Sequence, residues 1–538
     1  MTVDETIDAL RTAPSFIDPE TGFTVDITGM DLAEDALRDM LTPADRAPSQ
    51  LGQAHREMQR LEAGEIKNPD EGRKVTHFTD RIHYPESDVC AAVEAFADEV
   101  RQDSTINAVV INGIGGSALG PQLLQFACRG PYWNELTAVE RQGYPCIYFV
   151  DNTDTAGLRD VLDVVNLAEC LVVTISKSGG TQETKNTMIA FEQAYAEAGL
   201  DFASRAIAIT MEGSLLYKHA MESNWRNVFP MAESIGGRTS ETNVVGHVPA
   251  ALTGIDFQRF LEGARRMDKF TREPELTRNP AYQLAAAWYI TGNRRGDRNM
   301  VIVPYADRLV LLGKYLQQLV MESLGKELDR DGDVVHQGLT VYGNKGGTDA
   351  HAYIQQLNDG RDDFFVTFIE PLRDAMQVTV EEGVTMGDYL HAFKEGLVAA
   401  LRGKRRKVID IVMDSLNEQA LGMLVALYER AVAVYAEFIN INAFHQPGVQ
   451  AYKLASKEIN ALSERLRTWL TSDEQDGWCG DAAAAAEAIG TSDQAKAVAG
   501  LLAKYTVNGR MFAGRILSRT FQHGKWLYSL TDTNGSNQ

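Results

Sequence analysis

The sequence predicts an α/β protein in which two α/β/α sandwich domains, each built on a parallel sheet, are joined by a C-terminal helical region. Two observations support this fold class. The chain has 538 residues, too many for one ordinary hydrophobic core. Two separate regions also repeat the order of apolar strand, glycine-rich turn and amphipathic helix, which is typical of parallel sheets covered by helices.

The predicted strands are short apolar runs. The first region contains them at 108–112, 146–150, 171–175 and 206–210, and the second at 300–304, 339–343 and 364–369. Helical patterns occupy residues 256–293 between the regions, and residues 416–438 and 448–470 after them, where they could clamp the two domains together. The predicted divisions are an N-terminal helical part of the large domain at 1–74, a first α/β domain at 75–255, a second with its clamping helices at 256–475, and a C-terminal extension of unassigned chemistry at 476–538.

Composition narrows the class of protein. With 44% hydrophobic and 23% charged residues, the chain is typical of a globular, soluble protein. Its 52 Lys and Arg against 74 Asp and Glu give a net charge of -22, which repels nucleic acid and anionic membranes, so local groups must hold any anionic ligand. No signal sequence or membrane span is evident, and the five cysteines form no CxxC pair. We expect a cytoplasmic protein without a nucleic-acid or membrane partner.

A glycine-rich loop, Gly113–Gly120, follows the first predicted strand. Glycines at a strand-to-helix turn let the backbone approach a ligand, and the helix N-terminus presents unpaired N–H groups to which the Ser117 hydroxyl can be added. The loop also fits the dinucleotide pattern GxGxxG. That pattern needs an acidic residue ending the next strand, and Glu135 has the spacing but no strand before it, so NAD or FAD is disfavoured.

The second loop, Ser176–Thr184, carries groups that suit a phosphate monoester. Ser176, Ser178 and Thr181 can donate hydrogen bonds, and Lys177 adds positive charge. Alternatively, Thr181 caps the following helix and the serines only satisfy the turn. Because both loops leave the carboxyl ends of strands in one sheet, they meet where open α/β sheets bind ligands, which favours an anion site.

Glu322 is a candidate catalytic carboxylate. It lies in the predicted helix Gln317–Lys326, away from the apolar stripe of that helix. The alternative is an exposed charge paired with Lys326 four residues later, a contribution of only tenths of a kcal/mol.

Three further candidates lie in loop-to-helix segments. His351 is expected in the first turn of a helix capped by Thr348 or Asp349, Arg238 follows two glycines, and Lys453 ends the segment that begins at Asn442. Taken singly, each residue is equally compatible with a structural role.

In their order along the chain, these segments resemble the phosphoglucose isomerase family from about Val109 to Lys453. The resemblance is carried by Gly113–Gly120, Ser176–Thr184, Gly236–Ser240, Met321–Lys326, Gly347–His351 and Gln446–Lys453. It departs from the family pattern at Leu324, at Asp349-Ala350 and at Pro447, beside the proposed catalytic positions.

The resemblance implies a sugar isomerase (SIS) fold and the interconversion of glucose 6-phosphate and fructose 6-phosphate, an activity of glycolysis and gluconeogenesis. Glu322 would transfer a proton between C2 and C1 through a cis-enediol, with Arg238 stabilising the developing oxyanion and His351, assisted by Lys453, opening the sugar ring. No metal or other cofactor is implied, and the histidine would come from the partner of an obligate homodimer, so that each site is shared. The implied phosphate ligands are Ser176, Lys177, Ser178 and Thr181, and the remaining pocket residues are Ser117, Gln318 and Gln446.

Three alternatives remain. A non-catalytic sugar-phosphate sensor of the same fold would lose the proton carriers, all of which are present here. A dual isomerase would also accept mannose 6-phosphate, which the sequence does not exclude. A metal-dependent sugar isomerase is disfavoured because no HxH, HxxxH or HExxH cluster occurs.

Overall fold

The computed structural model describes residues 1–12, 15–44, 47–475 and 477–532. They form two compact units, Met1–His445 and Gln446–Gln538. The predicted boundary near residue 475 therefore falls inside the second unit, because the helix preceding it packs on the C-terminal elements. The division near residue 255 lies within the first unit and stays a prediction.

The first unit contains a five-stranded parallel sheet in the order β6-β5-β7-β8-β9. Its central strands are completely buried, as their apolar sequences predict. The four predicted strands are confirmed, and β9 is an addition at the edge. The bounds are β5 Ala108–Asn112, β6 Cys146–Val150, β7 Cys170–Ile175, β8 Ala206–Thr210 and β9 Asn227–Pro230, with helices α5 Asp88–Gln102, α6 Gly116–Arg129, α7 Thr155–Val164, α8 Gln182–Glu197, α9 Leu215–Glu222 and α10 Val244–Leu252.

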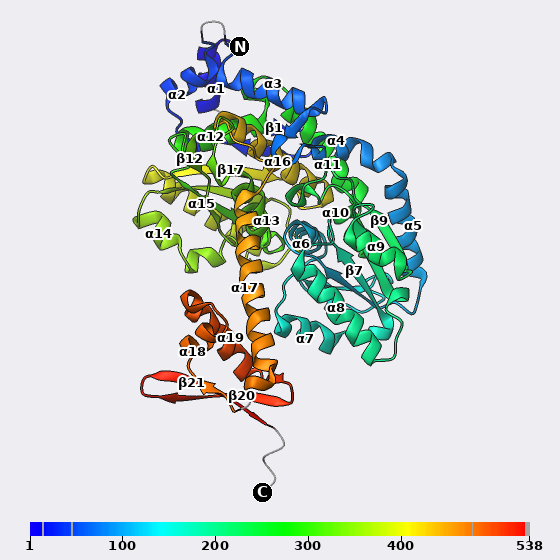
Figure 1. Ribbon diagram of the computed structural model, residues 1–538. Helices are drawn as coiled ribbons and strands as arrows, with labels where there is room; N and C mark the ends of the chain where they lie inside the picture. Colours follow the sequence, from blue (N-terminus) through cyan, green and yellow to red (C-terminus); the bar gives the residue numbers. More distant parts are fainter. Residues whose placement is uncertain (13–14, 45–46, 476, 533–538) are drawn as a thin grey trace. The chain divides into compact units, whose positions relative to one another are not determined.

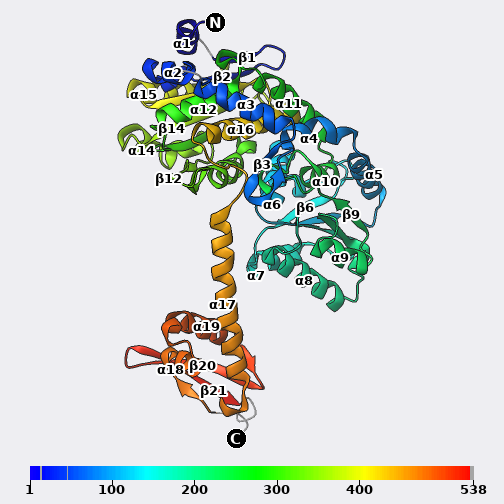
Figure 2. The same cartoon turned by 45° about the horizontal axis from the view of Figure 1, so that its top comes forward.

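A second sheet of six strands occupies the other half of the same unit (Figures 1 and 2). Four parallel strands form its body, and the N-terminal hairpin β1–β2 extends it by antiparallel pairing with β17, where Val25 lies opposite Ile411. Residues 1–74, predicted as the N-terminal helical part of the large domain, therefore also supply strands. The order is β1-β2-β17-β14-β10-β13, with β1 Phe16–Asp18, β2 Phe23–Asp26, β10 Asn299–Pro304, β13 Val341–Tyr342, β14 Phe364–Pro371, β17 Lys407–Met413, and helices α13 Leu312–Leu316, α14 Ile354–Asp359 and α15 Met386–Gly403.

Helix α16, Glu418–Phe438, forms the centre of the first unit. It is mostly apolar and almost wholly buried, as expected of a helix enclosed by other elements, and it packs on α3, α11 and α12. The helical patterns predicted at 256–293 and 416–438 are thus confirmed as α11 Phe257–Thr271, α12 Pro280–Thr291 and α16.

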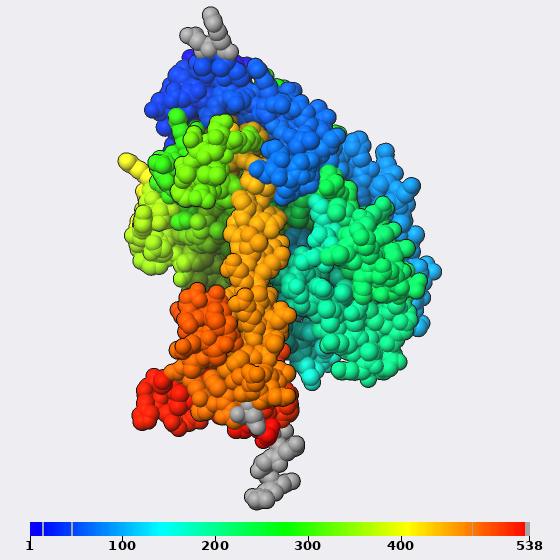
Figure 3. Space-filling model, viewed as in Figure 1, coloured from blue at the N-terminus to red at the C-terminus, as the bar shows by residue number. Residues whose placement is uncertain are grey.

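Shorter elements complete this unit. Figure 3 shows the N-terminal residues, in blue, as one continuous surface packed on the rest of the unit. These elements are α1 Val3–Thr12, α2 Glu34–Leu41, α3 Gln50–Glu62, α4 His77–His83, and the two-stranded pairs β3 Ile66–Asn68 with β4 Arg73–Lys74, β11 Lys326–Leu328 with β12 Val334–Gln337, and β15 Thr379–Glu381 with β16 Val384–Thr385.

The second unit combines helices with an antiparallel sheet that the sequence analysis did not predict. Leu462, Leu466 and Leu470 of α17 lie in its core with Leu502 and Leu530. Its elements are α17 Pro447–Thr471, α18 Ala482–Ala488, α19 Ala495–Val507 and the strands β18 Cys479–Gly480, β19 Met511–Phe512, β20 Arg515–Gln522 and β21 Lys525–Asp532, in the order β18-β21-β20-β19. None of the described helices in either unit has the length and apolar character needed to cross a membrane.

A buried ion network links α16 to its neighbours. Arg430 donates to Glu62 at 2.6 Å and to Asp268 at 3.0 Å, while Arg81 pairs with Glu429. Although burial alone would raise the pKa of Asp268, the surrounding guanidinium groups hold that pKa below its ordinary value. Each charge in this network depends on its partners, because an unpaired buried charge is strongly unfavourable.

We predict that Arg430→Met lowers stability by about 3–5 kcal/mol, because it leaves buried carboxylates without their cation. The midpoint of thermal unfolding, followed by circular dichroism, should fall clearly. Arg38→Met is the control, since Arg38 pairs with Asp4 and Glu34 on the exposed surface and its loss should leave the midpoint unchanged. Equal midpoints for both variants would contradict the role of the network.

Candidate active site

The loop after β5 has the backbone geometry required for close approach. Gly115 has φ +59°, and a Cβ there would lie 3.0 Å from Nε2 of Gln318. A Cβ on Gly116 would lie 1.8 Å from the Gly237 carbonyl oxygen. The loop from the first sheet therefore packs directly on Gln318 and on the turn that carries Arg238, and half-buried Ser117 lies in the first turn of α6 beside them.

The loop between β7 and α8 keeps its hydroxyl protons available. Ser176 Oγ accepts the Gly179 N–H and Ser178 Oγ accepts the Gly180 N–H, both at 3.1 Å. A hydroxyl that accepts such a bond can still donate its own hydrogen to an anion. Thr181 precedes α8, but its side chain caps no helix N–H in the described structure, so the simple capping alternative is not what is observed.

Lys177 brings positive charge to this loop. Its Nζ donates to the carbonyl oxygens of Glu233 and, at 2.9 Å, of Ile235. Arg73 lies nearby and donates to the carbonyl of Ser234 at 3.0 Å. Burial is the main cause, and the charge of Arg73 the second, that lowers the pKa of Lys177 to about 8. The two cations concentrate positive charge here, although the chain as a whole is acidic.

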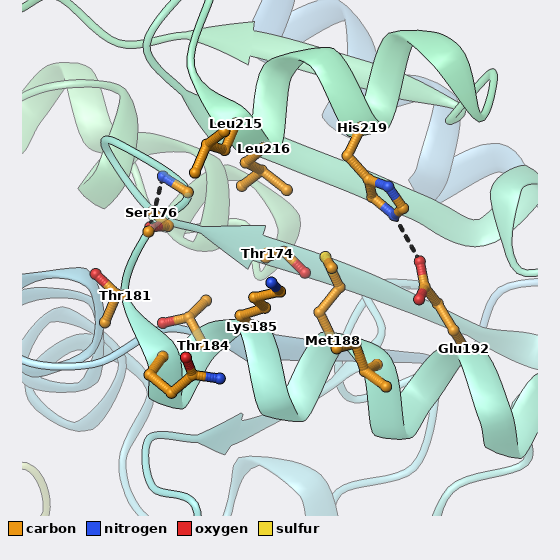
Figure 4. A pocket seen from close by; sticks show the side chains of 14 residues that line it. Thr174, Ser176, Thr181, Thr184, Lys185, Met188, Glu192, Leu215, Leu216 and His219 are labelled. Atoms are coloured by element: carbon orange, nitrogen blue, oxygen red, sulfur yellow. Dashed lines mark hydrogen bonds and ion pairs between the residues drawn. The ribbon is translucent and has the colours of Figure 1, made fainter. Parts of the chain in front are cut away.

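A cavity of about 390 Å³ lies on the flank of the same loop, and its lining side chains come from β7, α8, α9 and the loop itself (Figure 4). Ser176 and Thr181 line it at one end, and the His219–Glu192 pair, 2.7 Å apart, lines it at the other. The Thr184 hydroxyl is buried there without a hydrogen-bond partner among the described residues. The cavity therefore lies directly beside the predicted phosphate ligands.

Glu322 ends a short π-helical segment, Gln317–Glu322, that continues α13. Such wider turns are common at functional sites because they rotate the following side chains relative to a regular helix. The side chain is only 21% exposed, and its Oε2 lies 3.4 Å from Nη1 of Arg238. The exposed Glu322–Lys326 pair considered from the sequence does not form.

Lys326 has a different role from that alternative. Its buried Nζ donates to the backbone carbonyls of Glu322 at 2.9 Å and Ser323 at 2.7 Å, so it closes the end of the helical segment. Burial and the nearby charge of Arg238 lower its pKa to about 7. Lys326 therefore positions the Glu322 backbone.

Arg238 is the buried cation of the site, with 7% of its side chain exposed. Its Nη2 donates to the carbonyl oxygens of Ala443 at 2.7 Å and His445 at 3.2 Å, while Nη1 faces Glu322. Burial lowers its pKa and Glu322 opposes that shift, but a guanidinium remains protonated in proteins. Three distant segments are thus held around one fixed positive charge.

The local prediction for His351 was wrong. The histidine ends a short 3₁₀ turn, Thr348–His351, instead of lying in the first turn of a helix, because Asp349 accepts hydrogen bonds from Tyr353 and from Asn344 N at 3.0 Å and folds the loop on itself. His351 is exposed and lines a surface cavity with Tyr305. No hydrogen bond or ion pair joins it to Glu322 among the described residues.

Gln446 and Lys453 belong to the second unit. Gln446 directly precedes α17, and Lys453 is an exposed residue near the start of that helix. The structure thus brings together Ser117, Gln318, Arg238 and Glu322 within the first unit, with the Ser176–Thr181 loop on the same sheet. The sequence analysis missed Arg73 and the positioning role of Lys326. Arg73 lies in a two-residue strand outside any recognised motif, and no sequence pattern shows that the Lys326 amine is buried.

The fold is thus an α/β protein with two sheets. Its site combines the predicted anion-binding loops of the first sheet with a buried arginine beside Glu322, an arrangement suited to binding and transforming an anionic ligand. Comparison with known proteins defines the family. The phosphoglucose isomerase family model matches residues 52–400 and 391–473. Glucose-6-phosphate isomerase of Geobacter sulfurreducens is 44% identical over 502 residues, 89% of this chain and 91% of that protein, and the enzyme of Thermosynechococcus vestitus is 43% identical over 512 residues, 91% and 93%.

The solved structures agree with this assignment. A glucose-6-phosphate isomerase from Chlamydia trachomatis superimposes with a TM-score of 0.72 at 27% identity, covering 86% of this chain and 95% of its own. The chain belongs to the phosphoglucose isomerase family, and the predicted fold class is confirmed.

We predict that sulfate, whose charge is constant near neutral pH, binds more weakly as the pH rises through about 8, where Lys177 loses its proton. The affinity measured by calorimetry should fall about fivefold between pH 7 and 9, because a charge-assisted hydrogen bond of about 1.5 kcal/mol is lost as most of the lysine deprotonates. Lys177→Met should bind sulfate weakly over the whole range. A pH step that persists in this variant would assign it to another group.

Proposed function

We propose that this chain is a glucose-6-phosphate isomerase that interconverts glucose 6-phosphate and fructose 6-phosphate. The observation that carries the proposal is the Glu322–Arg238 pair, a half-buried carboxylate beside a fixed buried cation, in a chain of the phosphoglucose isomerase family. A carboxylate can exchange a carbon-bound proton, and a nearby cation lowers the barrier by stabilising the oxyanion that develops.

The substrate phosphate is held by the loop after β7. Ser176, Ser178 and Thr181 donate hydroxyl hydrogen bonds, Lys177 contributes charge, and the N-terminus of α8 adds its partial positive charge. Ser117 and Gln318 contribute the rest of the sugar-phosphate pocket, and the family resemblance assigns Gln446 to the same role. The hydroxyl oxygens of Ser176 and Ser178 accept hydrogen bonds from backbone N–H groups of the turn, so their own hydroxyl hydrogens can be donated to the phosphate. This arrangement supports the assignment.

Glu322 removes the proton from C2 of the open-chain aldose and returns it to C1 through a cis-enediol. Arg238 stabilises the negative charge that develops on the sugar oxygens during both transfers. His351, assisted by Lys453, first opens the ring by moving a proton between the ring oxygen and the C1 hydroxyl. No metal or other cofactor takes part in this scheme.

His351 acts in the site of a partner chain, so the working enzyme is a homodimer with shared sites. The exposed surface near His351 supports this arrangement. Phe393, which lines the His351 cavity, is 60% exposed, and Met376 and Met386 on the adjoining cavity are 72% and 59% exposed. An apolar surface of this kind marks a protein contact.

We place the protein in the cytoplasm. The free thiols at all five cysteines are consistent with a reducing cytoplasm.

Glu322→Gln tests the proposed base. We predict that it lowers turnover of fructose 6-phosphate at least about a thousandfold, since general-base catalysis contributes roughly 10²–10⁴ and the amide accepts no proton, while substrate affinity is retained. The assay couples glucose 6-phosphate formation to a dehydrogenase, with chelator present. Glu327→Gln, an exposed neighbour, is the control and should retain activity. Substantial turnover by Glu322→Gln would remove the residue from its role, and binding without turnover by the unaltered chain would favour the sensor.

Mixing two inactive variants tests the shared site. Chains carrying Glu322→Gln and chains carrying His351→Asn are dissociated together and reassembled. In a dimer with shared sites, half the dimers are mixed and each has one intact site, so about a quarter of the normal activity should return. If both residues act within one chain, every site keeps a lesion and no activity returns.

A further inference from the structure

A cluster of three metal-ligand types lies between α5 and α10, outside the proposed catalytic groups. Cys90 and Glu94 are one helical turn apart on α5, and His247 comes from α10, which packs on α5 (Figure 2). One atom from each, the thiol sulfur, a carboxylate oxygen and a ring nitrogen, lie within 4.8 Å of one another. Cys90 and His247 are buried, whereas the Glu94 side chain is 50% exposed and opens the cluster to solvent.

The His247 ring is held in a fixed orientation. It stacks on Phe257 with ring centroids 4.4 Å apart and an interplanar angle of 9°. Its Nδ1 lies 2.9 Å from the Tyr84 hydroxyl, and its Nε2 lies 2.8 Å from the Glu94 carboxylate. An outer hydrogen bond on one ring nitrogen, with the other nitrogen aimed at anionic ligands, is the usual arrangement of a metal-binding histidine.

The surrounding groups also tolerate the changes of protonation that a metal requires. When Nε2 binds a cation, the ring proton moves to Nδ1, and the Tyr84 hydroxyl, which either donates or accepts, becomes the acceptor. Gln258 Nε2 donates to the Cys90 sulfur at 3.2 Å and would stabilise the thiolate.

We propose that Cys90, Glu94 and His247 bind a zinc ion with water as the fourth ligand. Sulfur, imidazole nitrogen and carboxylate oxygen are the ligands zinc takes in tetrahedral sites, and a thiolate selects against magnesium and calcium. Binding releases the thiol proton to solvent and leaves the histidine neutral. The site holds the two helices together and takes no part in sugar isomerisation.

A second cluster, Glu370, His391 and Glu395, lacks room for such an ion. The Lys394 ammonium already lies among these side chains, 3.2 Å from Glu370 and 2.8 Å from Glu395. This cluster supplies a matched comparison, because it has a histidine and two carboxylates but no thiol.

The test uses the full chain and cobalt(II), which replaces zinc and reports thiolate bonding by a sulfur-to-metal charge-transfer band. We expect one tight ion per chain with this band, displaced by Zn²⁺. Cys90→Ser should abolish the band, and Glu94→Gln, at the solvent edge where folding is not at risk, should weaken binding more than about tenfold.

Cys479→Ser and His391→Gln are the controls and should leave the band unchanged. A band that survives Cys90→Ser, a band lost in Cys479→Ser, or the absence of any thiolate band in the unaltered chain would overturn the proposal. An unchanged circular dichroism spectrum verifies that the Cys90→Ser variant is folded. Because the readout is spectral, the outcome is independent of whether the proposed isomerase activity is correct.

Discussion

The candidate site depends on the buried guanidinium of Arg238. A charge that is 93% buried is tolerated only when its donors are satisfied, and here the carbonyl oxygens of Ala443 and His445 accept on one side while Glu322 faces it on the other. Since these partners come from segments more than a hundred residues apart, the arginine fixes the end of the first unit, the π-helical segment and its own turn in one geometry. The carboxylate consequently lies beside a cation before any substrate arrives.

Two glycines allow the loop after β5 to pack closely against the segments that carry Gln318 and Arg238. Gly116 lets the first loop touch the Gly237 carbonyl, and Gly115 lets it touch Gln318. Local positive charge at the loop after β7 offsets the negative charge of the chain as a whole. Backbone carbonyl oxygens hold the cations of Lys177 and Arg73 beside the predicted phosphate ligands. A net charge of -22 and an anionic ligand are thus compatible.

The sequence was most informative where one physical signal dominated. Apolar runs predicted the central strands, and long helical periodicity predicted α11, α12, α16 and α17, because complete burial and helical amphipathicity leave clear patterns. The edge strand β9 and the hairpin β1–β2 were missed, since short edge strands depend on pairing that no local pattern records. β17 was also missed, and the antiparallel sheet of the second unit was not recognised in a basic and aromatic segment.

The site shows the same limit. Motifs identified Ser176, Arg238 and Glu322 as candidates, but the ion pair between the last two arises from tertiary packing across 84 positions of sequence, and the π-helical turn that aims Glu322 is set by its surroundings. The alternative in which Lys326 pairs with the Glu322 carboxylate is not observed, because the buried lysine amine donates to the Glu322 backbone carbonyl instead.

The central claim is that a proton, and not a hydride, moves between adjacent sugar carbons at Glu322. The most direct measurement is conversion of fructose 6-phosphate to glucose 6-phosphate in deuterium oxide, with chelator present and the product examined by NMR. Transfer through an enediol predicts deuterium at C2 of the product, because the protonated carboxylate exchanges with solvent in part of the turnovers. Rapid turnover with only protium at C2 would contradict the account.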